Sequence, residues 1–507
     1  MDISDVLSKL DPDGALRGEA KDKGITLPDE DVASLKDLGK DCDRRTKLAP
    51  YETEDDAAVY KGDGTKGYAT IQISDLLQES GNADGTENDA TLMHVMDALV
   101  SHSCLIVDVT DGGTSFADAY KLSNMWNTCS KFFDTIQGDD ELIRSLPGMK
   151  TAEGAGSPHA VTGFSSYDDR SMQFMETRIV RASDESDNTN ERTIVPDEAV
   201  KVIDVGGVND MVSAFDVMYG VGKDICRVAV AAANMEYGAF VGMDDSSDED
   251  TQGGGSDLPF ISGLTFDETE IAGIQDEDGD FVVSARLSSA AAATMADELI
   301  DDGKFNSRNP DQGGINMSPH RLCRYEGKKK GGDEKYESKS QETFGAHTDT
   351  SFLTLVPAAE VSGLEIFDED ANRWLRPELL ARQVWEEERR RKGLDPSALT
   401  DTVTIFEGGE EREVELPWYS RYVVAMPGEL LQIATRNEVG AAVHRVVSVK
   451  EGNVRISAPV LLRARSGMRM NLPKYFGNID TTGSLLKECD GMKMEEIHNA
   501  LQPSNYR

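Results

Sequence analysis

The stretch Gly345-Ala346-His347-Thr348-Asp349 decides the fold and the chemistry that we predict for this chain of 507 residues. It places an imidazole and a carboxylate one residue apart, and His444 later opens another apolar, strand-like run. Two imidazoles and one carboxylate can bind Fe(II) on one face and leave three metal positions open. On a strand, residues 347 and 349 point to the same side, so both can reach one ion. We therefore predict that His347, Asp349 and His444 are metal ligands.

An Arg-x-Ser pair follows His444, beyond a turn at Glu451-Gly452-Asn453. We expect this turn to close a hairpin that brings Arg455 beside His444 on the neighbouring strand, with Ser457 on the same face. A guanidinium and a hydroxyl are suited to holding a carboxylate. The cavity would then fit a 2-oxo acid, with its keto-acid end on the metal and its far carboxylate on Arg455.

From about residue 321 short apolar runs alternate with turn signals, which predicts a β-sandwich or jelly roll. A charged helix interrupts the series and is predicted to be an insertion, together with a polar segment at 407–415. The predicted strands cover 352–356, 363–367, 422–426, 430–434, 444–449 and 454–462, and the predicted helix covers 378–392.

The first half of the chain is predicted to open with a β-α-β-α pattern. Its strands fall at 68–73 and 105–109, its helices at 90–101 and 116–133, and a long buried helix follows at about 208–237. Asp- and Gly-rich residues at 244–257 read as a flexible linker. We accordingly divide the chain into an acidic, partly disordered lead-in (1–66), an α/β region with insertions (67–243), the linker (244–257), a jelly-roll domain with an insertion near 378–416 (258–470), and a helical tail (471–507).

Several motifs occur in one order that resembles a known family. They are Arg321-Leu322-Cys323-Arg324-Tyr325, Gly345-Ala346-His347-Thr348-Asp349-Thr350, Val361-Ser362-Gly363-Leu364-Glu365-Ile366, Trp374, Pro427-Gly428-Glu429-Leu430-Leu431-Gln432, Val443-His444-Arg445-Val446 and Arg455-Ile456-Ser457. Together they resemble the isopenicillin-N-synthase-like 2-oxoglutarate/Fe(II) dioxygenases, a large soluble class abundant in plants. The resemblance covers residues 68–135 and 315–465 in patches.

The resemblance implies an α+β fold whose double-stranded β-helix (jelly-roll) core is flanked by helices, with an N-terminal α/β region. It implies that the three metal ligands hold Fe(II), and that Arg455 and Ser457 bind the distal carboxylate of 2-oxoglutarate. Tyr325 matches a tyrosine that contacts this cosubstrate, whereas Cys323 replaces the asparagine of the family. Fe(II), 2-oxoglutarate and O2 would serve the reaction, ascorbate could act as an accessory reductant, and no catalytic residue is expected beyond the metal centre.

Composition limits the partners and the compartment. The net charge is −41, so the surface should repel nucleic acid and anionic membranes. A well-solvated surface explains this charge, and an acidic surface for a basic protein partner is the alternative. The six cysteines are widely spaced, there is no apolar leader, and no run reaches the length of a membrane span. We expect a cytoplasmic protein that acts on a small molecule; its oligomeric state stays open.

Three functions remain open at this point. The leading one is an oxygenase that uses Fe(II) and 2-oxoglutarate to hydroxylate a small organic substrate, with desaturation or ring closure as other outcomes. The second is an iron-dependent oxidase that does not use 2-oxoglutarate. The third is a non-catalytic binding or regulatory homologue. The identity of the substrate does not follow from the sequence, because the loops that would contact it resemble the family least.

Overall fold

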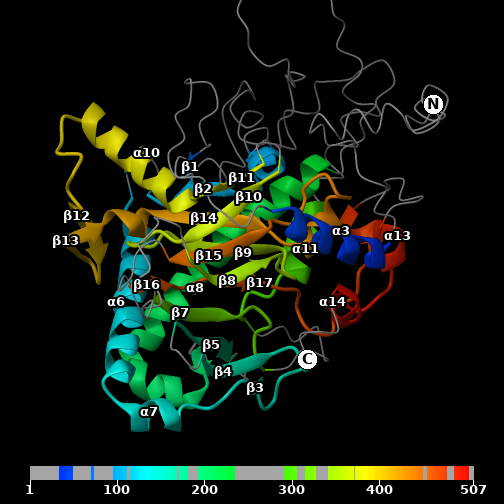
Figure 1. Cartoon of the computed structure of the whole chain (residues 1–507), viewed down its shortest axis with the longest axis horizontal. Helices are drawn as coiled ribbons and strands as arrows, with labels where there is room; N and C mark the ends of the chain where they lie inside the picture. The colour runs from blue at the N-terminus through cyan, green and yellow to red at the C-terminus, as the bar shows by residue number, and fades with distance from the viewer. Residues whose placement is uncertain are drawn as a thin grey trace, which may run out of the picture.

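A computed structural model describes residues 34–49, 70–72, 95–96, 98–110, 113, 115–167, 171–180, 192–233, 291–304, 314–326, 341–369, 372–448, 454–476 and 485–501. These residues form two packed β-sheets flanked by helices (Figure 1). This mixed α+β architecture confirms the predicted fold class. The predicted linker at 244–257 lies outside the described residues, so the division into domains stays a prediction.

The larger sheet runs through the middle of the molecule and is antiparallel except for its first pair, β1 and β2. Two further strands extend it: β16 (Val454–Ser457) pairs with β7, and β6 (Thr193–Val195) pairs with β5. The main order is β1 (Thr70–Gln72), β2 (Leu105–Asp108), β14 (Tyr422–Pro427), β9 (Leu353–Pro357), β17 (Val460–Leu462), β7 (His320–Glu326), β5 (Met172–Val180), β4 (Val161–Ser166) and β3 (Lys150–Thr151).

The smaller sheet has four antiparallel strands and packs on the first sheet through apolar side chains. Its order is β11 (Arg373–Leu375), β10 (Leu364–Asp368), β15 (His444–Ser448) and β8 (Gln341–His347). Val356 of β9 packs with Ile366 of β10, and Tyr325 of β7 packs with Val446 of β15. These contacts make the two sheets the halves of a β-sandwich.

Helices cover the outer face of the larger sheet. The main ones are α6 (Ala117–Gln137) and α8 (Asp197–Ala233). Along β9, Leu355 belongs to the core beneath these helices while Val356 faces the smaller sheet, as the alternation of a strand requires. Gly222 lets α8 approach closely, because a Cβ there would lie 3.0 Å from a methyl carbon of Leu355. The strand is thus buried on both sides, which explains why all its residues except Thr354 are apolar.

The remaining helices lie at the edges (Figure 1). Residues 34–49 of the predicted lead-in contain α3, which lies beside α14. The bounds are α3 (Leu35–Leu48), α7 (Asp140–Ser145), α10 (Pro377–Arg391), the 3-10 helix η5 (Trp418–Arg421), α11 (Glu429–Ala434), α12 (Leu472–Phe476), α13 (Leu485–Cys489) and α14 (Met494–Leu501). The last three lie within the described part of the predicted C-terminal tail.

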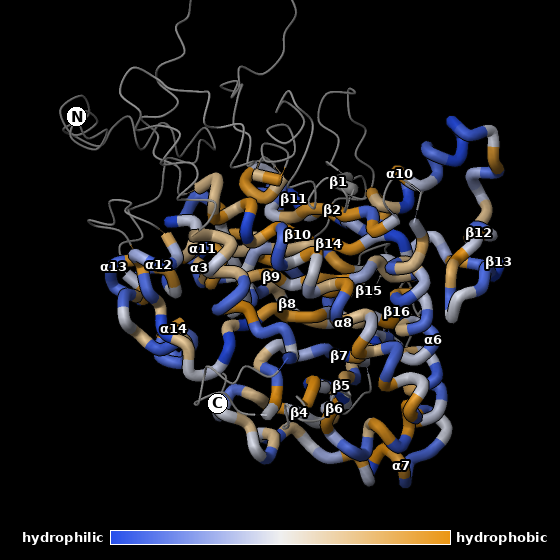
Figure 2. The backbone as a smooth tube through the Cα atoms, turned by 180° about the vertical axis from the view of Figure 1, so that it is seen from behind, coloured by the Kyte–Doolittle hydropathy of each residue, from blue (hydrophilic) through white to orange (hydrophobic). Residues whose placement is uncertain are grey.

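The predicted insertion consists of α10 and a two-stranded hairpin, β12 (Thr400–Glu407) and β13 (Glu410–Pro417). Both project from one side of the molecule (Figure 1), and the outer end of α10 is strongly hydrophilic (Figure 2). The inner end of α10 is anchored, because Trp385 packs with Trp418 and Tyr422 in a buried cluster. The insertion is therefore joined to the sheet rather than tethered loosely to it.

One strand prediction was wrong and another was wrong in part. Residues 430–434 belong to the helix α11 rather than to a strand, since Glu429 begins a buried helical turn after the N-cap Gly428. The run 454–462 is two strands, β16 and β17, which pair with different parts of the sheet.

The six cysteines are all free and buried: Cys42, Cys104, Cys129, Cys226, Cys323 and Cys489. Within the described ranges, no helix has the length and apolar character needed to cross a membrane.

Candidate metal centre

His347 and His444 come from two neighbouring strands of the smaller sheet, β8 at its edge and β15 beside it. His347 is the last residue of β8, His444 is the first of β15, and the two are register partners across the antiparallel ladder. Their ring centroids lie 4.3 Å apart with the planes tilted by 48°. This cross-strand pair places the two imidazoles side by side where β8 ends and β15 begins.

Asp349 completes the group. Its carboxylate lies 3.7 Å from His347 Nε2 and 3.4 Å from His444 Nε2, and the three ligand atoms lie within 4.8 Å of one another. The predicted convergence is therefore present. Its cause differs from the expected strand alternation, however, because β8 ends at His347 and Asp349 follows in the loop. The loop is fixed by the Thr354 hydroxyl, which donates a hydrogen bond to Asp349 Oδ2 over 2.7 Å.

The backbone fixes the tautomer of both imidazoles. His347 Nδ1 lies 2.8 Å from the carbonyl of Gly345, and His444 Nδ1 lies 3.1 Å from the carbonyl of Ala442. A carbonyl only accepts, so each Nδ1 must carry the proton and each Nε2 keeps a lone pair. Both lone pairs are thus directed to the side where the Asp349 carboxylate lies.

The charges of these groups suit a cation. Burial lowers the pKa of His347 to about 4, and the neighbouring His444 lowers it further. Burial alone would raise the pKa of Asp349, but His444, His347 and the Thr354 hydroxyl lower it to about 2. Near neutral pH the group therefore contains a neutral His347 and an ionised Asp349, which are the protonation states that bind a metal ion. The donor set fits Fe(II), with positions left for other ligands.

The start of α11 supports the loop that carries Asp349. The backbone N–H of Glu429 donates to the carbonyl of Asp349 at 2.9 Å. The Glu429 carboxylate accepts hydrogen bonds from the hydroxyls of Thr348 at 2.8 Å and Thr350 at 2.6 Å. Sequence reasoning missed this role because it assigned 430–434 to a strand. The signal was present in Pro427-Gly428-Glu429, which places an N-cap glycine and an acidic first turn before an apolar run.

Arg455, Ser457 and Tyr325 lie together, although not as predicted. β16 pairs with β7 of the larger sheet instead of forming a hairpin beside β15, and Arg455 is the register partner of Tyr325. All three side chains are buried, and the Arg455 guanidinium carbon lies 5.5 Å from the centre of the Tyr325 ring. Arg455 therefore approaches β15 from the opposite sheet, across the interior of the sandwich. Gly363 marks this approach, because a Cβ there would lie 2.7 Å from both Arg455 Cδ and the carbonyl oxygen of Val447.

Arg455 already has an anionic partner, which sequence reasoning did not foresee. Its Nη2 donates to Glu378 Oε1 over 2.7 Å, and Glu378 is completely buried at the start of α10. Burial alone would lower the pKa of Arg455, but Glu378 and Tyr325 raise it, so the guanidinium stays charged. Arg455 is thus a buried cation with a carboxylate of the chain itself attached to it, and its predicted role toward a ligand stays a prediction.

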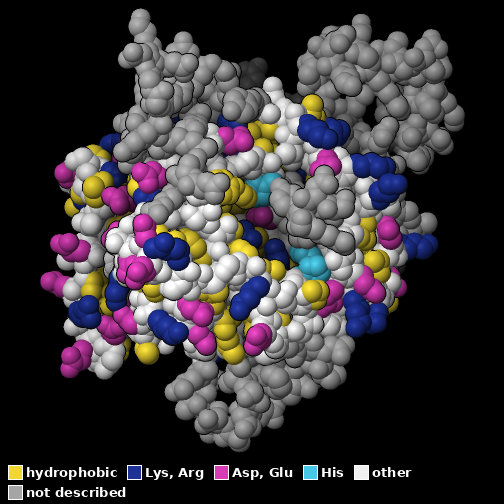
Figure 3. Space-filling view, turned by 60° about the horizontal axis from the view of Figure 1, so that its bottom comes forward, with side chains coloured by type: hydrophobic (Ala, Val, Ile, Leu, Met, Phe, Trp, Pro, Cys, Tyr) yellow, Lys and Arg dark blue, Asp and Glu magenta, His cyan; other side chains and the backbone are white. Residues whose placement is uncertain are grey.

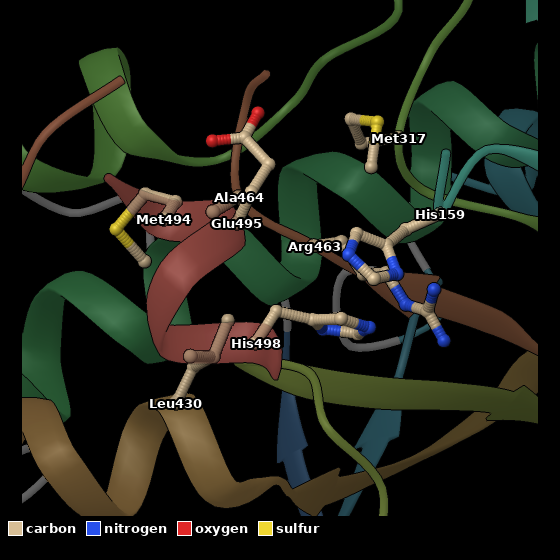
Figure 4. Close-up of a pocket in the computed structure, with 8 residues that line it drawn as sticks. All are labelled: His159, Met317, Leu430, Arg463, Ala464, Met494, Glu495 and His498. Carbon is tan, nitrogen blue, oxygen red and sulfur yellow. The ribbon is translucent and has the colours of Figure 1, made fainter. Parts of the chain in front are cut away.

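A small pocket lies beyond α11 (Figure 4). Leu430, Arg463 and His498 line it together with His159, whose ring centroid lies 4.4 Å from that of His498. Asp349 and Glu429 are among the groups that influence the pKa of Arg463, so this pocket belongs to the electrostatic surroundings of the candidate metal ligands. On one face of the molecule, histidine, acidic and basic side chains gather in a hollow (Figure 3).

Comparisons with known proteins find similar structures but no similar sequences. No family model and no curated protein matches the chain. A full-length Neurospora crassa protein, solved in complex with alpha-KG and 5-formyluracil, is 13% identical with a TM-score of 0.43, covering 88% of this chain and 99% of that one. Dioxygenase for auxin oxidation 1 from Arabidopsis thaliana, solved with 2-oxoglutarate, is 12% identical with a TM-score of 0.38, covering 79% and 93%. The rice dioxygenase for auxin oxidation is 13% identical with a TM-score of 0.36, covering 78% and 82%. At these values the likeness concerns overall architecture, and the function has to be argued from the residues of this chain.

Proposed function

We propose that this protein is an Fe(II)- and 2-oxoglutarate-dependent oxygenase that acts on a small organic substrate. The observation that carries the proposal is the convergence of His347, Asp349 and His444 within 4.8 Å, with both Nδ1 atoms engaged by backbone carbonyls. A ferrous ion held by these ligands would supply the redox chemistry that activates O2, with three positions open for cosubstrate and oxygen. Iron, 2-oxoglutarate and O2 are thus the proposed cofactors.

The side chains around the metal ligands have separate tasks in this proposal. Thr354 and the Gly345 and Ala442 carbonyls orient the three ligands, as outer partners of metal sites commonly do. Arg455, with Ser457 and Tyr325, would bind the far end of the cosubstrate. Val446 packs against Tyr325 between the sheets and would keep water from the bound acid.

The overall reaction balances as a coupled oxidation. One O2 and one 2-oxoglutarate give succinate and CO2, and the second oxygen atom enters the substrate as a hydroxyl group. Desaturation or ring closure would instead remove two hydrogens from the substrate as water. Hydroxylation is the leading proposal. A net charge of −41 argues against a nucleic-acid substrate, and we propose a cytoplasmic location and ascorbate as an accessory reductant.

Succinate release tests this proposal. The purified chain is incubated with Fe(II), O2 and labelled 2-oxoglutarate against pools of small metabolites, with Asp349→Asn as the inactive comparison. We expect succinate in substoichiometric amounts without substrate and a marked increase with the right pool. Turnover of a substrate without succinate would contradict the use of 2-oxoglutarate.

One observation favours a second function, an iron-dependent oxidase that does not use 2-oxoglutarate. The cation proposed for the cosubstrate is already paired with Glu378 at 2.7 Å. In such an oxidase Arg455 would have a structural task only, and substrate oxidation would proceed with another reductant. A non-catalytic homologue would bind neither the acid nor iron. An anaerobic Fe(II) titration of the full chain distinguishes it from both enzymes.

A further inference from the structure

Glu378 is held by more donors than a helix anchor requires. Its Oε2 accepts from the backbone N–H groups of Gly363 at 2.8 Å and Leu364 at 3.2 Å. Its Oε1 accepts from the N–H of Ala359 at 3.3 Å and from Arg455 Nη2 at 2.7 Å. Four donors around one buried carboxylate fix its position. The carboxylate is therefore a permanent part of the interior.

The pair changes what Arg455 can offer a ligand. A lone buried guanidinium would attract any carboxylate strongly, because the interior screens charge poorly. With Glu378 attached, the two side chains are together neutral. Arg455 Nε is buried and has no hydrogen-bond partner among the described residues, so part of the guanidinium remains available as a donor. The site thus offers a hydrogen bond without a net positive charge.

We propose that Glu378 is a specificity-determining residue that weakens the preference of this site for a second carboxylate on the 2-oxo acid. The inference rests on the proposed function, because it assumes that a 2-oxo acid binds the metal held by His347, Asp349 and His444. A dianionic acid such as 2-oxoglutarate would place its far carboxylate near Glu378, and repulsion would offset the attraction of Arg455. An acid with an uncharged far end avoids this repulsion. Glu378 lies on α10, so the predicted insertion reaches directly into the cosubstrate end of the site.

The competing interpretation is purely structural. In it, Glu378 only ties α10 to the β9–β10 connection and Arg455 turns to the ligand when the acid binds. The two interpretations predict different ratios between the affinities of the site for two acids, rather than different activities. Two acids of equal length separate them: 2-oxoglutarate and 2-oxopentanoate, which has a methyl group where the other has its far carboxylate.

The experiment is an anaerobic titration of the Fe(II)-loaded full chain with each acid, followed by the visible charge-transfer band and by calorimetry. For the wild type we expect the two dissociation constants to agree within about tenfold, because the attraction of Arg455 for the far carboxylate and the repulsion by Glu378 offset each other. For Glu378→Gln we expect the preference for 2-oxoglutarate to rise by about ten- to a hundredfold, the range for a hydrogen bond to a charged group. Glu386→Gln, which loses a pair with Arg382 on the same helix, is the control and should leave the ratio unchanged.

Each outcome of the titration supports or overturns the role proposed for Glu378. A wild-type preference for 2-oxoglutarate above about a hundredfold overturns the inference, and this measurement needs no variant if Glu378→Gln does not fold. An unchanged ratio in a folded Glu378→Gln protein also overturns it, while leaving the proposed function intact. If iron binds but neither acid binds to the wild type or to the variant, the proposed function fails and the inference fails with it.

Discussion

His347 and His444 stand directly opposite each other across β8 and β15, and their ring centroids lie 4.3 Å apart. Asp349 is positioned differently, by a loop that packs on the first turn of α11. The candidate centre therefore depends on one strand pairing and one loop. Changes to either support should alter metal binding in ways that can be measured separately.

Removal of the hydroxyl at Thr354 should weaken metal binding without unfolding the chain. Thr354→Val keeps the shape of the side chain but deletes the hydrogen bond to Asp349 Oδ2. Loss of such an outer partner commonly costs about 10- to 100-fold in metal affinity. Thr343→Val is the matched control, because that buried hydroxyl donates to the carbonyl of Val446 and to no metal ligand. Equal Fe(II) affinities for both variants in calorimetry would contradict a role for Thr354.

A side chain at Gly428 should displace the loop that carries Asp349. A Cβ there would lie 2.5 Å from Ser351 Oγ and 2.7 Å from the carbonyl oxygen of Asp349. We expect Gly428→Ala to lower the free energy of unfolding by about 1–3 kcal/mol, as overpacking does, and to weaken metal binding.

Gly220 provides the opposite case in α8. A Cβ at this position meets nothing within 4 Å, and alanine favours a helix by about 1 kcal/mol over glycine. Gly220→Ala should therefore stabilise the chain in urea unfolding and leave metal affinity unchanged. A Gly428→Ala variant as stable as Gly220→Ala would show that the loop and α11 can move apart freely.

Acid should destabilise the fold partly through His498. Burial lowers its pKa to about 2, with contributions from Arg463, His159 and Arg178. Because the folded pKa lies below the ordinary value of about 6.5, the unfolded chain takes up a proton first as pH falls. The stabilising effect of the neutral ring is complete above pH 6.5 and is lost below it. Between pH 7 and pH 5 the loss from this one group is at most about 2 kcal/mol.

Urea unfolding of the metal-free chain at these two pH values measures this effect. We expect His498→Gln to lose less stability on acidification than the wild type, because its side chain does not titrate. The same loss in both proteins would mean that His498 takes up a proton in the folded state as readily as in the unfolded one.

The sequence predicts which side chains converge better than it predicts what supports them. Motif and order were enough to predict that His347, Asp349 and His444 lie together, and apolar runs between turn signals predicted β9, β10, β14 and β15. Residues Leu430–Ala434 were wrongly predicted to be a strand. Every residue of this short helix is buried, so no helical periodicity is visible in the sequence.

Local sequence patterns could not predict the contacts between distant segments. The turn predicted at residues 451–453 suggested a hairpin between β15 and β16. However, β16 joins the other sheet through β7, and turn residues do not reveal which sheet a strand will join. The pair between Arg455 and Glu378 joins residues 77 positions apart, and no sequence motif next to either residue predicts it. The same limit applied to Thr354 and Glu429, whose roles depend on how the loop after β8 folds.

An anaerobic Fe(II) titration of the full chain tests the central claim most directly. The wild type should bind one Fe(II) per chain, and His347→Ala and His444→Ala should each weaken binding by at least about a hundredfold, since each removes a ligand. His102→Ala, which changes a histidine outside this group, should bind as the wild type does. A wild type that binds no Fe(II), or His347→Ala and His444→Ala variants that bind it as tightly as His102→Ala, would contradict the claim that His347, Asp349 and His444 form a metal centre.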